Sequence, residues 1–214
     1  MPLISTGVVI SQSGSIIRYI AGETGLDGDN ERERAKIDMV FETVKELFGG
    51  HRTITFDGAA LANVTQFHDF VNSGNPILHF RETTNRGTYD KIMKSAAVLK
   101  TFNDMLSNNE RNQKFLVGHK ASYADLALFH QLEKAHETTL PNLYQVLTNL
   151  GMRRLLEHYL EFSGNMLLSQ YLSSDRRMPP IERRDGDYHY IFPAAPEDDP
   201  EHMQIEETIP HADL

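Results

Sequence analysis

One stretch in the middle of the chain constrains the fold more than any other, because it joins a polar helix cap to an apolar helix. Residues 115–129 read FLVGHKASYADLALF. Ser122 and Asp125 have the spacing of a capping box, in which the hydroxyl accepts from the amide of Asp125 and the carboxylate accepts from the amide of Ser122. The first two turns that follow are apolar on nearly all sides. We therefore expect a buried helix with a polar clasp at its start.

The composition limits the class of protein and its partners. The chain has 214 residues, 40% of them hydrophobic and 24% charged, and its net charge of −9 argues against nucleic acid and anionic membranes as partners. The absence of cysteine excludes disulfides, thiolate catalysis and cysteine-based zinc sites. The ten histidines contain no H-E-x-x-H motif and no tight cluster, so we predict no metal site.

The same composition bears on location. No apolar run approaches the ~20 residues that a membrane span needs. The first residues, MPLISTGVVISQSG, contain no basic region of the kind that opens a secretory signal peptide. We therefore expect a cytoplasmic protein with no membrane partner.

Apolar spacing predicts a mainly helical chain that begins with two short strands. Ile37, Val40, Phe41 and Val44, for example, recur at the spacing of one helix face. Glycines, prolines and caps mark the expected ends of the helices. We expect strands at residues 3–4 and 8–10, and helices from 13 to the glycines at 22 and 25 and at about 30–48, 59–73, 88–107, 122–138, 141–162 and 163–172.

The last part of the chain differs from the rest in charge. Residues 173–214 hold 11 acidic and 4 basic residues and six of the nine prolines. Within them, residues 193–214 contain no Lys or Arg, and we expect disorder there because such a stretch buries too little apolar surface. The basic segment 176–184 has two interpretations: it lines the mouth of a cleft for an acidic substrate, or it is a solvated, locally paired segment.

Two parts of the chain resemble the glutathione S-transferase superfamily. In that superfamily a segment of the form F-x-V-G-x-x-x-S-x-A-D opens the central helix of an all-helical C-terminal domain, and residues 115–125 match it. The N-terminal stretch MPLISTGVVISQSGSIIRYIA resembles the end of the thioredoxin-like domain, where a cis-proline strand and a hairpin lead into a Q/E-S helix. The resemblance is to the sigma, pi and mu-like classes and covers residues 1–48 and 88–172, while 49–87 looks inserted.

This resemblance implies a fold and a set of domains. We expect a mainly α protein, in which a glutathione S-transferase-type helical domain follows a partial thioredoxin-like domain made of a β-hairpin and a helix. The predicted domains are 1–27, thioredoxin-like and glutathione-binding; 28–172, all-helical; and 173–214, an acidic, proline-containing tail that is partly disordered.

The resemblance also implies where glutathione binds. Gln12 and Ser13 would hold its γ-glutamyl end, and Met1, before the cis-proline, would pair backbone to backbone with its cysteinyl part. A serine at a helix N-terminus presents a hydroxyl and free amides to an anion, which supports this assignment. In the alternative reading, Ser13 is only a helix cap and Gln12 a turn residue.

Asp38 is a fourth candidate for the glutathione site. The segment ERERAKIDMVFETVKEL resembles the first long helix of the helical domain. There an aspartate reaches across a homodimer interface to the α-amino group of the neighbour's glutathione, and Asp38 stands in that position. In the alternative reading Asp38 is a solvated carboxylate beside the apolar stripe.

The sequence leaves two classes of function open. In the family, the residue that stabilises the thiolate lies in a segment before the cis-proline, so we expect that this chain lacks it through N-terminal truncation, and we assign no catalytic residue. With such a segment, the resemblance implies a detoxifying enzyme that conjugates glutathione, as co-substrate, to small hydrophobic electrophiles. Without it, the chain would be a non-catalytic binding or interaction module, as in lens crystallins and complex-assembly subunits.

Overall fold

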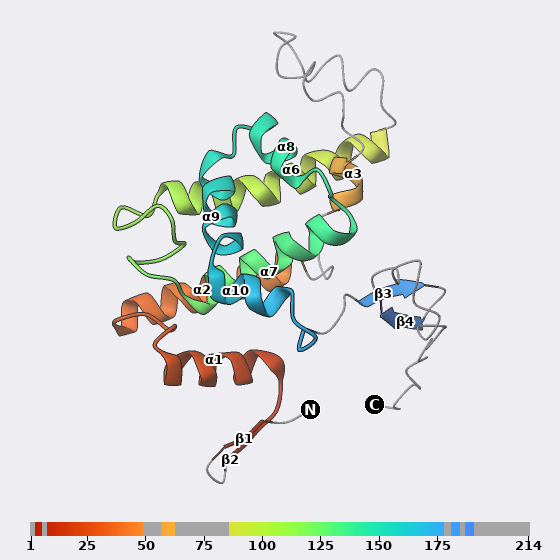
Figure 1. The fold of residues 1–214 in the computed structure, drawn as a ribbon. Helices are drawn as coiled ribbons and strands as arrows, with labels where there is room; N and C mark the ends of the chain where they lie inside the picture. Colours follow the sequence, from red (N-terminus) through yellow and green to blue (C-terminus); the bar gives the residue numbers. More distant parts are fainter. Residues whose placement is uncertain are drawn as a thin grey trace. The chain divides into compact units, whose positions relative to one another are not determined.

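The computed structural model describes residues 3–5, 8–48, 57–62, 86–177, 181–184 and 187–190. The chain divides into two compact units, Met1–Gly164 and Asn165–Leu214. The first unit holds nearly all of the helices, and the second holds one helix and a hairpin (Figure 1). The predicted domain boundaries at 27/28 and 172/173 stay predictions.

The first unit begins with a hairpin and continues as a helical bundle. Strands β1 (Leu3–Ser5) and β2 (Val8–Ile10) pair antiparallel. The helices that follow are α1 (Ser13–Thr24), α2 (Glu31–Phe48), α3 (Gly58–Ala62), α6 (Arg86–Ser107), α7 (Tyr123–Thr138), α8 (Leu143–Asn149) and α9 (Arg153–Ser163). The prediction of a mainly α protein, with a hairpin and a helix at its start, is confirmed.

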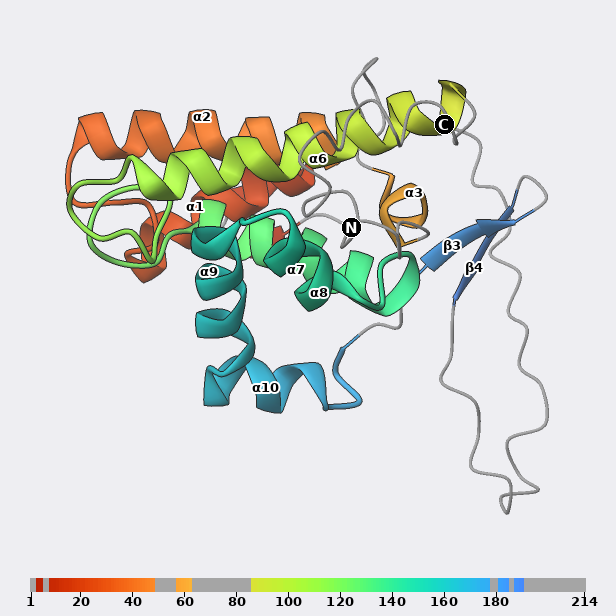
Figure 2. The same cartoon turned by 90° about the horizontal axis from the view of Figure 1, so that it is seen from above.

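The core of this unit lies where α7 meets α2 and α9. Figure 2 shows α2 and α6 running in opposite directions, with α9 crossing α6 at a steep angle. Ile37, Phe102, Leu128, Leu132 and Tyr159, from α2, α6, α7 and α9, are each at most 1% exposed. Burying each such side chain stabilises the fold by about 1.5–3 kcal/mol relative to leaving it in water.

The capping box at the start of α7 is present as predicted, and it is completely buried. One carboxylate oxygen of Asp125 accepts from the amide of Ser122 at 2.9 Å and from its hydroxyl at 2.6 Å. The other accepts from the amide of Leu116 at 2.8 Å. Burial raises the pKa of Asp125, although the nearby His158 ring and these donors oppose the shift. The clasp thus joins the loop before α7 to the first turn of the helix.

The prediction of one helix over 141–162 is wrong, because the chain forms α8 and α9 with a break between them. Gly151 has φ +66° and donates to Thr148, while the amide of Met152 donates to Leu147 at 2.9 Å. This pattern is a Schellman motif, which ends a helix at a left-handed glycine. Helix α9 then starts under a tertiary cap, since the Asn103 side chain accepts from the amides of residues 154 and 155 at 3.1 and 3.2 Å.

Other element predictions differ in smaller ways. In the predicted helix 59–73, α3 ends at Ala62, and residues 63–73 lie outside the described residues. The short helix expected at 163–172 begins at Met166, because the side chain of Asn165 accepts from the amides of the first turn.

The second unit contains α10 (Met166–Leu172) and a hairpin that the sequence patterns did not predict. Strands β3 (Ile181–Arg184) and β4 (Asp187–Tyr190) pair antiparallel, so part of the predicted basic segment is a strand. The disorder predicted for 193–214 lies outside the described residues. Within the described ranges, none of the helices has the length and apolar character to cross a membrane.

Candidate functional site

The start of α1 has a strained backbone and no cap. Gln12, the residue before the helix, has φ 73° and ψ 122°, and among the described residues it is the one non-glycine with positive φ. Its carbonyl accepts from the amide of Ile16 at 3.0 Å, but its side chain makes no capping hydrogen bond. A backbone in such a region costs about 1–3 kcal/mol, and residues of this kind cluster at functional sites.

The first turn of α1 is open to an anion. Ser13 is exposed, the side chain of Gln12 makes no capping hydrogen bond, and the turn contains no acidic residue. Free amides at a helix N-terminus, together with the positive end of the helix dipole, attract negative groups. The structure therefore brings Gln12 and Ser13 together in an arrangement that suits a carboxylate.

Two cationic side chains lie beside this turn. A Cβ built on Gly14 would lie 3.1 Å from Nη1 of Arg18 and 3.6 Å from Nζ of Lys45. Both cations also lie over the ring of Phe41, each 5.4 Å from its centroid. Both are also paired with carboxylates of α2, so what favours an anion at this corner is the positive end of the helix dipole.

Asp38 lies in the same cluster and is engaged within its own chain. Its Oδ1 accepts from Nε of Arg18 at 2.6 Å and from the hydroxyl of Tyr123 at 2.9 Å. Arg18 donates from Nη2 to Glu42, and Lys45 lies 3.1 Å from the same carboxylate. Side chains from α1, α2 and α7 thus meet at one carboxylate, which is still 45% exposed.

These contacts set the charge states in the cluster. Burial works to raise the pKa of Asp38, but the hydrogen bonds from Arg18 and Tyr123 outweigh it and hold the pKa below its usual range. The hydrogen bond from Arg18 also lowers the pKa of Glu42. Burial, with the hydrogen bond to Asp38, raises the pKa of Tyr123 to about 12. At neutral pH the carboxylates are therefore ionised and the phenol is a donor.

An apolar groove runs beside Ser13 between α1, α2 and α7. Its volume is about 390 Å³, which lies in the range of small-molecule sites. Apolar side chains of the three helices form most of its wall, and Ile17 and Ile20 are 36% and 44% exposed. Among the residues lining it, Lys45 is the one of Asp, Glu, Lys or Arg type.

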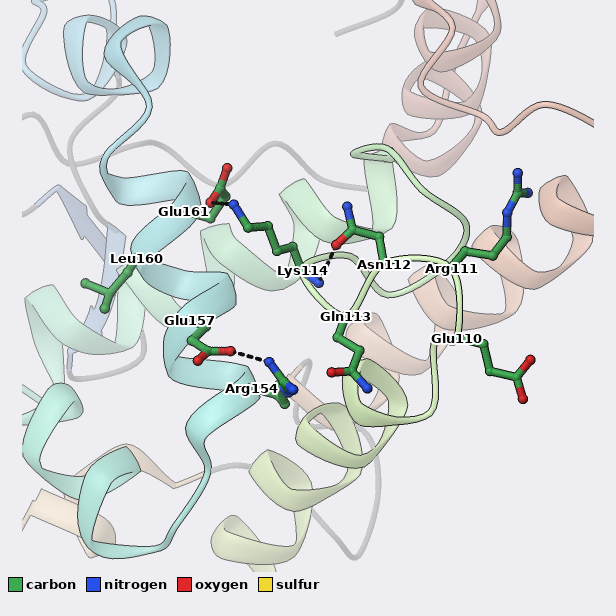
Figure 3. Close-up of a pocket in the computed structure, with 9 residues that line it drawn as sticks. All are labelled: Glu110, Arg111, Asn112, Gln113, Lys114, Arg154, Glu157, Leu160 and Glu161. Carbon is green, nitrogen blue, oxygen red and sulfur yellow. Dashed lines mark hydrogen bonds and ion pairs between the residues drawn. The ribbon is translucent and has the colours of Figure 1, made fainter.

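A larger hollow, of about 720 Å³, lies between the loop at 110–114 and α9, but most of its charged side chains are already paired (Figure 3). Lys114 is 2.7 Å from Glu161, and Arg154 is 2.7 Å from Glu157. Arg111, also in its wall, pairs with Glu33. Side chains that neutralise one another offer little to a charged ligand, so we assign no site there.

The predicted site residues fall into two groups. Gln12, Ser13 and Asp38 belong to one corner of the first unit, with Asp38 linked to α1 through Arg18. Met1 lies outside the described residues. The described part of the chain contains no group of three or more His, Cys, Asp or Glu side chains placed to hold a metal ion.

Sequence reasoning did not single out the partners Arg18, Lys45 and Tyr123. Arg18 follows Gly14 by four residues, and Lys45 follows Phe41 by four. This spacing places each pair on the same face of its helix. Tyr123 offered no such signal, because it is 85 residues from Asp38. Only the packing of α7 on α2 brings its hydroxyl to the carboxylate.

Comparisons with known proteins agree with the fold. The family model described as "Glutathione S-transferase, C-terminal domain" matches residues 68–175. "Glutathione S-transferase P 1" of Xenopus laevis is 31% identical over 170 residues, which cover 79% of this chain and 65% of the relative. "Glutathione S-transferase P" of Caenorhabditis elegans is 26% identical over 180 residues, covering 84% of this chain and 72% of the relative.

Among solved structures, poplar glutathione transferase F1 is similar in fold. It superposes with a TM-score of 0.51 at 20% identity, over 80% of this chain and 71% of the poplar chain. At that identity the likeness concerns the fold alone. This chain also spans slightly less than two thirds of the Xenopus relative, at 65% of its length.

Proposed function

Because this chain belongs to the glutathione S-transferase superfamily, we propose that it binds glutathione at the start of α1 and conjugates its thiolate to small apolar electrophiles. One observation carries the proposal: a strained Gln12 leads into an uncapped, exposed helix start with two cations beside it. A fold that needed only a stable helix would relieve that strain and cap those amides.

The proposed contacts follow from the charges of glutathione. The carboxylate of its γ-glutamyl end accepts from the amide and hydroxyl of Ser13, while Arg18 and Lys45 stay paired with Asp38 and Glu42. Its α-amino group needs a carboxylate, and Asp38 of a neighbouring copy fits that role in a homodimer. Oδ1 of Asp38 is already engaged by Arg18 and Tyr123, so Oδ2 would be the acceptor.

The chemical step needs more than binding. A thiol with a pKa of about 8.5 is mostly protonated at neutral pH, so an enzyme must stabilise the thiolate. We assign that role to none of the described residues. What this chain's own residues supply is the binding and orientation of the tripeptide, and transfer is tested separately from binding.

Calorimetric titration with glutathione tests binding. Ser13→Ala removes one hydrogen bond to a charged group, so we expect the dissociation constant to rise about tenfold. Ser107→Ala is the matched control, since that exposed hydroxyl lies at the end of α6. Equal affinity in the Ser13 variant and the wild type would favour the alternative in which Ser13 is only the first residue of a helix. Turnover of a chloronitrobenzene substrate then reports transfer.

A second function, as a non-catalytic binding module, is favoured by the apolar groove beside Ser13. Its two exposed isoleucines would be covered by an apolar ligand or partner surface. Ile20→Asp should abolish binding of an apolar fluorescent dye and leave glutathione affinity unchanged. Dye binding without glutathione binding would support this second function over the first.

We also propose a homodimer and a cytoplasmic location, in line with the predicted partners. Light scattering on the purified chain measures the first. Fractionation of cells that express the tagged protein measures the second.

A further inference from the structure

The hydroxyl of Tyr123 makes a contact that the proposed glutathione site does not itself use. Tyr123 is the first residue of α7 and is 6% exposed. Its hydroxyl donates to Oδ1 of Asp38 at 2.9 Å, and the same oxygen accepts from Arg18 at 2.6 Å. The phenol therefore helps to orient the carboxylate that holds α1.

The start of α7 is a rigid place from which to act. Its clasp is fully buried, and Asp125 there accepts three hydrogen bonds. The amide of Tyr123 also donates to the carbonyl of Leu26, at 3.0 Å, just beyond the end of α1. A side chain anchored in this way moves little, so it can fix a neighbour that is half exposed.

From Asp38 the contacts continue to the ligand end of α1. Arg18 is bound by Asp38 and Glu42, and its Nη1 lies 3.1 Å from the Cβ position of Gly14, next to Ser13. The ring of Tyr123 packs edge-on against Phe41 at 5.1 Å, and Phe41 lies under both Arg18 and Lys45. The hydroxyl and the ring thus act on the same turn by separate routes.

We infer that Tyr123 is a positioning residue for the glutathione site: through Asp38 and Arg18, its hydroxyl sets the place of the first turn of α1. The inference rests on the proposed function, because glutathione is the ligand whose affinity depends on where this turn lies. In this scheme Tyr123 does not contact glutathione, and it acts through the side chains of Asp38 and Arg18.

Tyr123→Phe tests the inference, because it deletes the hydroxyl and keeps the ring against Phe41. We expect glutathione affinity, measured by calorimetric titration, to fall three- to tenfold. Tyr159→Phe is the matched control: it removes another buried phenol hydroxyl, which donates to Glu133, ten residues further along α7. The control should lose stability in the same way and keep wild-type affinity.

A double-mutant cycle and a pH profile separate positioning from general loosening. If the hydroxyl acts through Asp38, Tyr123→Phe should add little to the loss caused by Asp38→Asn. The carboxylate faces Arg18 on α1, Lys45 on α2 and Tyr123 on α7, and Glu42 on α2 shares Arg18 with it. Without the hydroxyl it loses a donor to its ionised form, so its pKa rises and binding should fail at a higher pH on acidification. Tyr159→Phe should not change the pH at which binding fails on acidification.

Hydrogen exchange gives a readout that does not depend on glutathione. In Tyr123→Phe, the amides of residues 16–21 in α1 should exchange faster, while Tyr159→Phe should not affect them. If the wild-type protein does not bind glutathione but Tyr123→Phe still exchanges faster in α1, the positioning of α1 is upheld and the proposed function is overturned. Wild-type binding with unchanged affinity and unchanged exchange in Tyr123→Phe would overturn the inference.

Discussion

The starts of α7 and α1 contrast sharply, although each begins at or just after a serine. At α7, Ser122 and Asp125 are at most 1% exposed, and the Asp125 carboxylate accepts from the amides of Leu116 and Ser122. At α1, Gln12 is strained and its side chain makes no capping hydrogen bond, and Ser13 is exposed. The first arrangement stabilises the fold, and the second leaves donors free for a ligand. The comparison teaches that an unsatisfied helix start is a better guide to a site than a satisfied one.

The largest effect should come from removing the clasp at α7. Asp125→Ala leaves the buried amides of Leu116 and Ser122 without their acceptor, and each unsatisfied group costs about 1–3 kcal/mol. We expect the free energy of unfolding in urea to fall by about 3–5 kcal/mol. Asp104→Ala, which removes an exposed pair with Lys100, is the control and should change it by less than about 1 kcal/mol. Similar losses in both variants would show that the clasp does not carry the fold.

A smaller effect is expected at the start of α9, where the cap is a side chain from another helix. Asn103→Ala removes the acceptor for the amides of Arg154 and Leu155, so we expect a loss of about 1–2 kcal/mol. Urea unfolding measures it, and Asn149→Ala, at the half-buried last residue of α8, serves as the control. If Asn103→Ala lowered the free energy of unfolding as much as Asp125→Ala does, burial of the clasp would add no stability beyond that of an ordinary helix cap.

At the start of α1, in contrast, we expect a substitution to raise the stability of the protein. Gln12→Gly relieves the left-handed backbone, so we expect stability to rise by about 1 kcal/mol, while glutathione affinity falls through the looser turn. Gln12→Ala keeps the strain and should give no such gain. If the glycine variant were both more stable and equally able to bind, the strain would serve no purpose at this site.

Much of this molecule could be predicted because the signals are local. The capping box of Ser122 and Asp125 lies within four residues, and the hairpin before α1 within ten, so short-range patterns sufficed. Gln12 and Ser13 were assigned by resemblance to the family and not by a pattern of their own, and their role in a glutathione site stays a prediction. The unpredicted break at Gly151 also has a local cause, but the apolar spacing of 141–162 continues through it and concealed the glycine.

The contacts between distant residues needed the tertiary structure. Asn103 caps a helix 51 residues later, and Tyr123 reaches Asp38 across 85 residues. Neither residue has a pattern around it that names its partner, because hydrogen bonds of this kind depend on where whole helices pack. The sequence by itself determined that a buried, clasped helix and a second helix beginning at Ser13 both exist. Only the packing of α1, α2 and α7 brought the hydroxyl of a tyrosine in the first helix to the carboxylate that binds Arg18 of the second.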